Sequence, residues 1–212
     1  NIWNLKGSDN TYFGHFPQAF MENLLYYYTE PFDLVYDPFA GSGTTIDACH
    51  KMFRKCIASD RKPIANRAGE IIEWNVQDGM PEIPKPDLLF LDPPYWVLAK
   101  KEYSDDDGDL GNMTKDDFFT VMRHLADEAA RRKIKRIAYL IRPIWDTKEV
   151  GDWEWVDPMF DLYESLSKDY RIEARYVLPY STQQYRADWV ECAKDKKRCL
   201  ILNRELTVLI RR

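Results

Sequence analysis

The sequence predicts an α/β fold with a doubly wound sheet of about seven strands and helices on both faces. Short apolar runs of strand length alternate with segments of helical periodicity along the 212 residues. A glycine-rich turn follows the first of these runs and opens a helical segment. Because 45% of the residues are hydrophobic, we expect a packed core and a single domain over residues 1–212. The first residue is Asn, which leaves room for flanking domains in a longer chain.

The expected strands are short apolar runs. They are Leu34–Tyr36, Cys56–Ser59, Asp87–Leu91, Ile137–Ile141, Ile172–Leu178, Cys199–Leu202 and Leu206–Ile210. We expect a tight turn at Asn203–Glu205 to join the last two as a hairpin. Ligands of a doubly wound sheet bind beyond the carboxyl ends of its strands, so the functional residues are expected there.

The expected helices begin at residues that favour a first helical turn. One helix covers Thr44–Phe53, directly after the glycine-rich turn. Pro63 suits the first turn of a second helix. Thr114 is the expected N-cap of a long amphipathic helix over Lys115–Arg132, and a further helix is expected over Asp157–Ser167.

The charge of the chain is unevenly distributed. The net charge is −5, which opposes binding to phosphates, but local fields matter more than the total. Basic residues gather at Arg131, Arg132, Lys133, Lys135 and Arg136, and again at Lys194, Lys196, Lys197, Arg198, Arg211 and Arg212. Nucleic-acid binding therefore stays open.

Metal, redox and membrane roles are not indicated. The 4 cysteines contain no Cys-x-x-Cys pair and the 3 histidines are scattered, so we expect no metal site and free thiols in a cytoplasmic protein. The sequence contains no charged-then-apolar leader, and no apolar run approaches the roughly 18 residues that a membrane-spanning helix needs.

The glycine-rich turn at Asp37–Thr45 predicts a ligand site. Gly41 and Gly43 allow the backbone to approach a ligand closely, and the helix that follows offers free N–H groups. Ile46 stands where a dinucleotide-binding turn has Gly or Ala, which argues against NAD and FAD. Asp37 would repel a diphosphate but attract an amino or sulfonium group. The alternative interpretation is that this segment is an ordinary strand-to-helix turn that binds no ligand.

Two further acids follow the next elements. Asp60 ends the second strand, where such folds grasp a ribose diol. Asp78, within Asn75–Gly79, ends a short following segment, where it could hold an adenine amino group. Each is also an ordinary turn residue on its own. Three acids at successive strand ends are a stronger signal together.

The segment Asp92–Trp96 directly follows a buried strand and predicts a reaction centre. Pro93 and Pro94 restrict φ and lack N–H donors, so they hold carbonyl groups in one orientation. The Asp92 carboxylate and the Pro93 carbonyl can each accept one N–H of an aromatic amine, which directs the nitrogen lone pair toward a methyl sulfonium. Tyr95 can stack on the ring, with help from Trp96. Positioning and electrostatics would then drive the displacement.

These segments resemble the DNA amino-methyltransferases, the N6-adenine and N4-cytosine family. Asp37–Thr45 resembles the family's cofactor motif and Leu91–Trp96 its catalytic motif. His15, Phe16 and Pro17, with Phe20 and Leu24–Leu25, resemble its N-terminal motif, and segments within 179–208 resemble the C-terminal part of small members.

The resemblance implies a Rossmann-like methyltransferase fold with S-adenosylmethionine as the cofactor. It implies that Asp37, Thr44 and Thr45 hold the methionine portion, Phe39 lies near the adenine and Asp60 holds the ribose. The full set expected at the cofactor is His15, Phe16, Pro17, Asp37, Phe39, Gly41, Gly43, Thr44, Thr45, Asp60 and Asp78. The residues expected at the reaction are Asp92, Pro93, Pro94 and Tyr95.

The partner implied is DNA, either duplex with a flipped base or single-stranded. No long insertion separates the two motifs, so a recognition domain is not visible there. Recognition could come from residues 97–117, 145–155 or 183–186, from a missing domain, or from a homodimer or a separate subunit. The residues expected to contact the substrate are Trp96, Gln183, Gln184, Tyr185 and Arg186.

An Asp-led catalytic motif in this family more often accompanies adenine N6 than cytosine N4. We therefore expect an adenine-N6 DNA methyltransferase of a bacterial or phage restriction–modification system. The alternatives are a cytosine-N4 enzyme, an RNA base methyltransferase and an inactive methyltransferase-like subunit. The intact Asp92 and glycine turn argue against the inactive subunit.

Overall fold

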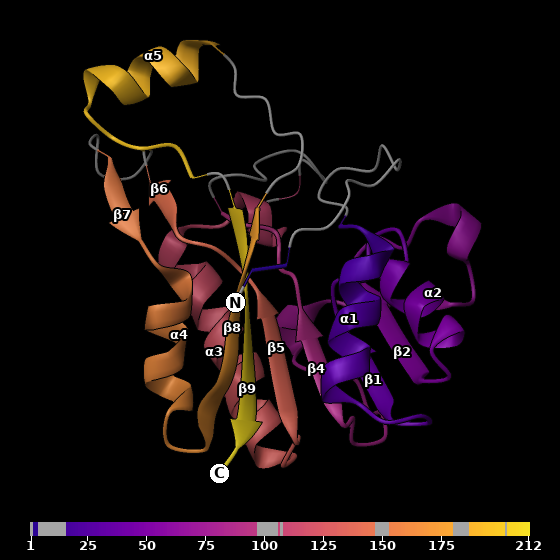
Figure 1. Ribbon diagram of the computed structural model, residues 1–212. Helices are drawn as coiled ribbons and strands as arrows, with labels where there is room; N and C mark the ends of the chain where they lie inside the picture. Colours follow the sequence, from indigo (N-terminus) through magenta and orange to yellow (C-terminus); the bar gives the residue numbers. More distant parts are fainter. Residues whose placement is uncertain are drawn as a thin grey trace.

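The computed structural model describes residues 2–3, 16–96, 106, 108–146, 153–179, 187–201 and 203–212, with 187–189 described by backbone alone. A seven-stranded sheet in the order β3-β2-β1-β4-β5-β9-β8 runs through the molecule (Figure 1). Its strands are β1 (Leu34–Asp37), β2 (Lys55–Asp60), β3 (Ile71–Glu73), β4 (Leu88–Leu91), β5 (Arg136–Leu140), β8 (Tyr170–Pro179) and β9 (Asn203–Arg211). The prediction of a seven-stranded α/β sheet is confirmed.

The first five strands of the sheet order are parallel, and β9 is antiparallel to both β5 and β8. This arrangement brings the carboxyl ends of β1, β2 and β4 and the beginning of β9 to the same edge of the sheet. A separate pair, β6 (Ile144–Asp146) and β7 (Glu154–Val156), lies beyond that edge (Figure 1).

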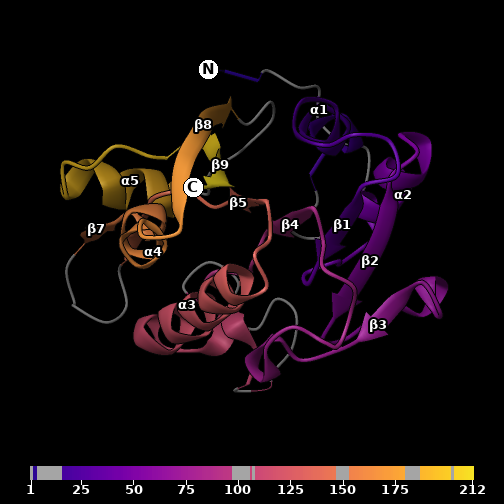
Figure 2. The ribbon, with the colours of Figure 1, turned by 90° about the horizontal axis from the view of Figure 1, so that it is seen from below.

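Helices cover both faces of the sheet, as predicted (Figure 2). The helices are α1 (Gln18–Tyr28), α2 (Thr44–Lys51), α3 (Lys115–Arg131), α4 (Pro158–Leu166) and α5 (Ala187–Asp195), with single 3-10 turns η1 (Ala65–Arg67), η2 (Val76–Asp78) and η3 (Leu110–Asn112). Helices α1 and α2 pack on one face, and α3 and α4 on the other.

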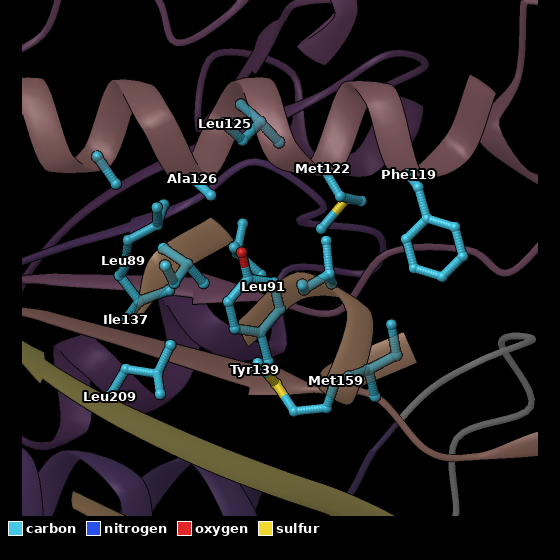
Figure 3. Packing of buried hydrophobic residues seen from close by; sticks show 14 of the residues in the cluster. Leu89, Leu91, Phe119, Met122, Leu125, Ala126, Ile137, Tyr139, Met159 and Leu209 are labelled. Carbon is cyan, nitrogen blue, oxygen red and sulfur yellow. The ribbon is translucent and has the colours of Figure 1, made fainter. Parts of the chain in front are cut away.

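Strand β4 shows why both faces are covered. All four of its residues are buried, and they alternate between two hydrophobic clusters. Leu88 and Phe90 pack in the cluster that contains α1, whereas Leu89 and Leu91 pack in the cluster beneath α3. Figure 3 shows this second cluster, in which Met122 of α3 faces the sheet. Truncating such a side chain to Ala typically costs about 2–5 kcal/mol.

Two helices begin where the sequence predicts, because local capping decides a helix start. The Thr114 side chain accepts a hydrogen bond from the Asp117 N–H at the beginning of α3. At α4, Asp157 accepts from the N–H groups of Met159 and Phe160, and Pro158 occupies the first turn.

Several element predictions are wrong. Pro63 precedes only the short turn η1, because the backbone reverses at Gly69, whose φ is +87°, before β3. Asn203–Glu205 is not a turn but the start of β9, where it pairs with Val177–Pro179 of β8. Cys199–Ile201 is not a strand, and Leu202 lies outside the described residues. Strands β3, β6 and β7 and helix α5 were not predicted from the sequence, and no helix bounds were given for α1.

Candidate functional site

Three carboxylates lie along one edge of the sheet. Asp37 ends β1, Asp60 ends β2 and Asp92 directly follows β4. These strands are adjacent and parallel, so their carboxyl ends meet. Burial is the main cause that raises the pKa of Asp37, and the charges of Asp92 and Asp60 add to this rise, so Asp37 is close enough to interact with both groups. This edge of the sheet therefore gathers three acidic side chains beside one another.

Asp37 is an internal support of the glycine-rich turn. Its side chain is 1% exposed, its Oδ1 accepts the Phe39 N–H at 2.9 Å, and its Oδ2 accepts the Thr45 hydroxyl at 2.6 Å. Burial raises the pKa of Asp37 to about 7, although these two hydrogen bonds lower it. Its charge state is therefore sensitive to a nearby cation at neutral pH.

The turn itself uses left-handed backbone at two glycines. Gly41 has a φ of 50° and Gly43 a φ of 84°, a region that favours glycine. Gly43 is the N-cap of α2, and as a glycine it has no side chain of its own to close the cap. Thr44 and Thr45 are the first residues of α2, and both are buried. This end of α2 can offer N–H groups to a negatively charged ligand group.

Asp60 joins the turn to the neighbouring strand. Its Oδ2 accepts the Gly41 N–H at 2.9 Å, and its Oδ1 accepts the Lys62 N–H at 2.9 Å. Each carboxylate oxygen has about two acceptor sites, so Asp60 retains capacity for a pair of hydroxyl groups. This arrangement suits the role in ribose binding that the sequence predicts.

Arg67 covers the outer side of the turn, a contact that the sequence analysis missed. A Cβ added at Gly43 would lie 3.0 Å from the Arg67 Nε. The guanidinium also pairs with Asp47 of α2 and, at 2.8 Å, with Glu70. These pairs hold Arg67 against the start of α2.

The segment after β4 is anchored by its aromatic side chains. The Arg142 N–H donates to the Tyr95 hydroxyl at 2.9 Å, and Pro93 is buried. Burial raises the pKa of Tyr95, so this phenol stays neutral. Pro94 and the Tyr95 ring are only partly buried.

Trp96 lies in the hydrophobic core rather than at an open surface. It is 3% exposed, its ring packs on Phe118 and Phe119 of α3, and its Nε1 donates to Asp146 Oδ2 at 3.1 Å. The expected contact of Trp96 with a substrate base is not supported by this burial. Its observed role is to join the segment after β4 to α3 and β6.

Asp92 has a basic neighbour that the sequence analysis did not identify. Its side chain is 17% exposed, and its Oδ2 lies 3.5 Å from Nη1 of Arg204 on β9. Burial raises the pKa of Asp92 to about 6, and the charge of Arg204 opposes this rise. Asp92 thus combines restricted solvent access with a nearby cation.

The other predicted cofactor residues are spread around this edge. Phe16 contacts Phe20 and Phe90 edge-on at ring-centroid distances of 5.2 and 5.6 Å, and Pro17 is the N-cap of α1. Phe39 is partly buried against the cluster beneath α3. Asp78 is exposed in η2, so it does not end a strand as expected.

Five predicted site residues, His15, Gln183, Gln184, Tyr185 and Arg186, lie outside the described residues. Within the described part of the chain, no group of three His, Cys, Asp or Glu side chains is arranged to hold a metal ion. Among the same residues, no helix is both long and apolar enough to cross a membrane.

Residues 1–68 match the model of the family described as DNA methylase, N6_N4_Mtase. The match confirms the resemblance over these residues, which include the glycine-rich turn and Asp60 but end before Asp92. No curated protein matches the chain.

Three solved structures have a similar fold. A TehB-like SAM-dependent methyltransferase from Corynebacterium glutamicum is 12% identical, with a TM-score of 0.51 over 97% of this chain and 90% of that chain. A putative rRNA-methylase from Clostridium thermocellum is 12% identical, with a TM-score of 0.54 over 99% and 100% of the two chains.

The third is a 1,6-didemethyltoxoflavin-N1-methyltransferase from Burkholderia thailandensis, solved with 1,6-didemethyltoxoflavin and S-adenosylhomocysteine bound. It is 11% identical, with a TM-score of 0.55 over 92% of this chain and 77% of that chain. At such identities the similarity shows the fold alone. The predicted Rossmann-like fold of SAM-dependent methyltransferases is confirmed.

Proposed function

We propose that this chain transfers a methyl group from S-adenosylmethionine to the exocyclic amino group of a base in DNA, with adenine N6 as the favoured target. One observation carries the proposal. Asp92 lies at the end of β4, beside the end of β1 that carries the glycine-rich turn. An amine acceptor thus adjoins a turn suited to a cationic ligand.

The residues around the turn fit this cofactor. S-adenosylmethionine supplies a methyl group on a sulfonium, together with an amino group, a carboxylate and a ribose diol. The carboxylates of Asp37 and Asp60 favour its positive charge, and Asp60 has acceptor sites for the diol. The N-terminus of α2 suits the ligand's carboxylate through its N–H groups and the positive end of the helix dipole. Phe39, Thr44 and Thr45 complete the proposed lining.

At the reaction centre, Asp92 and Pro93 hold the amine. The Asp92 carboxylate and the Pro93 carbonyl each accept one N–H, so the nitrogen lone pair is directed at the methyl carbon. When bound, S-adenosylmethionine would supply the methyl group, which would pass from sulfur to the base nitrogen and leave S-adenosylhomocysteine. The nitrogen would then release one proton to the Asp92 carboxylate or to water. These residues act by positioning and by stabilising the positive charge that develops on nitrogen.

Tyr95 is the proposed stacking partner of the base. Its hydroxyl is held by the Arg142 N–H, which restricts the ring to one position. A base within a duplex cannot reach the end of a buried strand, so the target must be flipped out or single-stranded. Pro94 maintains the backbone of the same segment through its restricted φ.

The match of residues 1–68 to the DNA methylase family supports DNA as the substrate. The preference for adenine N6 follows from the family resemblance of the Asp-led motif. Cytosine N4 and an RNA base are the alternative targets.

The test is incubation with isotope-labelled S-adenosylmethionine and separate pools of duplex DNA, single-stranded DNA and RNA, all made in vitro without methylation. Nucleoside mass spectrometry then identifies the product. Labelled N6-methyladenine in DNA is the expected result. Labelled N4-methylcytosine in DNA would show that cytosine N4, and not adenine N6, is the target. Label in RNA alone would overturn the proposal that DNA is the substrate. Cofactor binding without label in any pool identifies an inactive subunit.

A further inference from the structure

We propose that Arg204 is a positioning residue of the reaction centre, which orients the Asp92 carboxylate and keeps it charged. This inference rests on the proposed function, because it assumes that Asp92 accepts a hydrogen bond from the base. The direct observation is that Arg204 Nη1 lies 3.5 Å from Asp92 Oδ2. Neither the glycine-rich turn nor the segment after β4 contains Arg204.

The sheet topology explains how Arg204 reaches Asp92. Strand β9 is antiparallel to β5, with Leu206 opposite Leu140, so Arg204 lies beyond the carboxyl end of β5. Strand β4 is the other neighbour of β5. Adjacent strands are about 4.8 Å apart, so a long side chain is needed to extend from β9 past β5 to the end of β4. An arginine at the beginning of β9 meets this requirement.

The separation of the two groups suits a supporting role. Charge-assisted N–H···O hydrogen bonds are typically about 2.7–2.9 Å long. At 3.5 Å, Nη1 of Arg204 attracts Oδ2 of Asp92 without a short hydrogen bond to it. The carboxylate therefore keeps acceptor capacity for the amine. Both side chains are largely shielded, with 22% of Arg204 and 17% of Asp92 exposed, so water screens the attraction only weakly.

The other charged and titratable groups around Asp92 do not supply this cation. Asp37 at the end of β1 repels the charge on Asp92. Tyr95, in the same segment, is a neutral phenol, and Arg142 after β5 acts on that phenol. Among the described residues, Arg204 is the basic group whose charge lowers the pKa of Asp92 against the effect of burial.

A protonated Asp92 could not perform the proposed role. A neutral carboxylic acid donates its own proton and is a weaker acceptor than a carboxylate, so it would not draw charge toward the amine. Burial alone pushes Asp92 toward this neutral form. The charge of Arg204 counteracts that effect.

The first experiment measures the Asp92 carboxyl directly by ¹³C NMR titration of the protein without substrate, with the signal assigned from Asp92→Asn. In Arg204→Gln, we expect Asp92 to titrate at a higher pH than in the wild type. Arg204→Lys retains the cation and should restore most of the wild-type titration. The matched control is Arg175→Gln, which removes the 2.6 Å pair between Arg175 of β8 and Glu205 of β9 and should leave Asp92 unchanged.

The second experiment measures methyl transfer to the DNA pool against pH, at saturating S-adenosylmethionine. Loss of the charge should move the acidic limb of the profile to higher pH. If the Asp92 pKa rises from about 6 to 7, turnover at pH 6.5 should fall about threefold, and each further unit should lower it by up to about tenfold. Turnover should recover toward the wild-type value at high pH. A purely structural defect would lower turnover equally at every pH.

An unchanged Asp92 titration in Arg204→Gln overturns the inference, as does a wild-type Asp92 that remains protonated at pH 7. The second of these outcomes is measured on the wild type alone, so it tests the inference even where Arg204→Gln fails to fold. A shifted titration without methyl transfer by the wild type would retain the Arg204–Asp92 pairing but reject the proposed function. Methyl transfer by the wild type with an unshifted titration would reject the pairing alone.

Discussion

The hydroxyl of Thr45, in the first turn of α2, donates a 2.6 Å hydrogen bond to Oδ2 of Asp37 at the end of β1. This bond joins the two ends of the glycine-rich turn beneath its surface. It also makes Asp37 part of the structural support of the turn, since both of its oxygens accept hydrogen bonds from within the turn. The turn therefore depends on a buried carboxylate whose pKa is about 7.

We predict that S-adenosylmethionine binding strengthens as the pH rises through about 7. A cationic ligand favours the ionised form of Asp37, so below its pKa each pH unit should weaken binding by up to about tenfold. Calorimetric titration between pH 5.5 and 8.5 measures the effect. Asp37→Asn is the comparison, and it should bind more weakly with little pH dependence. A flat wild-type profile would contradict the prediction.

The raised pKa of Asp37 also makes the stability of the protein depend on pH. Because the pKa of Asp37 is raised in the folded state, the native protein binds more protons than the unfolded chain between about pH 4 and pH 7. Stability contributed by Asp37 is therefore lost as the pH rises through this interval. Urea unfolding of the wild type and of Asp37→Asn at about pH 4 and pH 7 tests the sign of this effect. Between these pH values, the free energy of unfolding should fall more for the wild type than for the variant.

Asp92→Ala should abolish methyl transfer and leave cofactor binding largely intact. Removal of one electrostatic group from a reaction centre typically lowers turnover by at least about a hundredfold. Asp92 follows β4 and is outside the glycine-rich turn, so the cofactor affinity should stay close to that of the wild type. Single-turnover transfer and calorimetry separate the two effects. Unchanged turnover in this variant would refute the role given to Asp92.

Gly43→Ala should destabilise the protein more than Gly69→Ala. Both glycines have a left-handed φ, +84° and +87°, so both substitutions carry a similar backbone cost of about 1–2 kcal/mol. At Gly43 the new Cβ would also lie 3.0 Å from Arg67 Nε, whereas nothing lies within 4 Å of a Cβ at Gly69. Urea unfolding measures the difference, and Arg67→Ala in the Gly43→Ala background should reduce it. Equal losses of unfolding free energy in the two variants would show that the Arg67 side chain moves away from the new Cβ at no measurable cost.

Two buried tyrosines should respond oppositely to replacement by Phe. The Tyr139 hydroxyl is buried and has no hydrogen-bond partner among the described residues. The Tyr170 hydroxyl donates to the carbonyl oxygens of Ala129 and Ile134 at 3.2 and 2.9 Å. Tyr139→Phe should therefore be neutral or stabilising, and Tyr170→Phe should cost about 1–3 kcal/mol. Thermal unfolding of both variants checks the sign, and a clear loss in Tyr139→Phe would contradict it.

The exposed lysines after α5 should contribute to DNA binding. Helix α5 lies above β7, on the same side of the sheet as the carboxyl ends of the parallel strands (Figure 1). Next to Lys196 and Lys197, the Arg198 guanidinium stacks over the Trp145 ring at 5.2 Å. Replacing both lysines by Gln should weaken DNA binding and reduce the dependence of log Kd on log salt by about one for each phosphate that the variant no longer neutralises.

The matched control for these lysines is the pair Lys133 and Lys135, which precede β5 at the opposite edge of the sheet. Lys133 and Lys197 share a left-handed φ, 57° and 53°, so the backbone cost of substitution is similar. Fluorescence anisotropy across a salt series compares the two double variants. The same loss of affinity in both would mean that the effect comes from total charge and not from this surface.

Much of the site followed from local sequence. A buried strand, two glycines and the start of a helix form one continuous segment, so Asp37–Thr45 could be identified without knowledge of the sheet. The same holds for the segment that begins at Asp92, because it directly follows β4. Thr114 and Asp157 cap their helices through N–H groups only two or three residues away. Such features depend on sequence neighbours alone.

Tertiary structure decided the features that depend on which strands pair. Asn203 to Glu205 read as a turn in the sequence, but they extend β9 because β8 supplies their hydrogen-bond partners. That pairing carries Arg204 past the end of β5 to Asp92. Trp96 is buried because α3 packs over it and Asp146 accepts its N–H. Local sequence identified the candidate residues, and strand order determined which of them meet, because contacts between distant segments exist only once the sheet has formed.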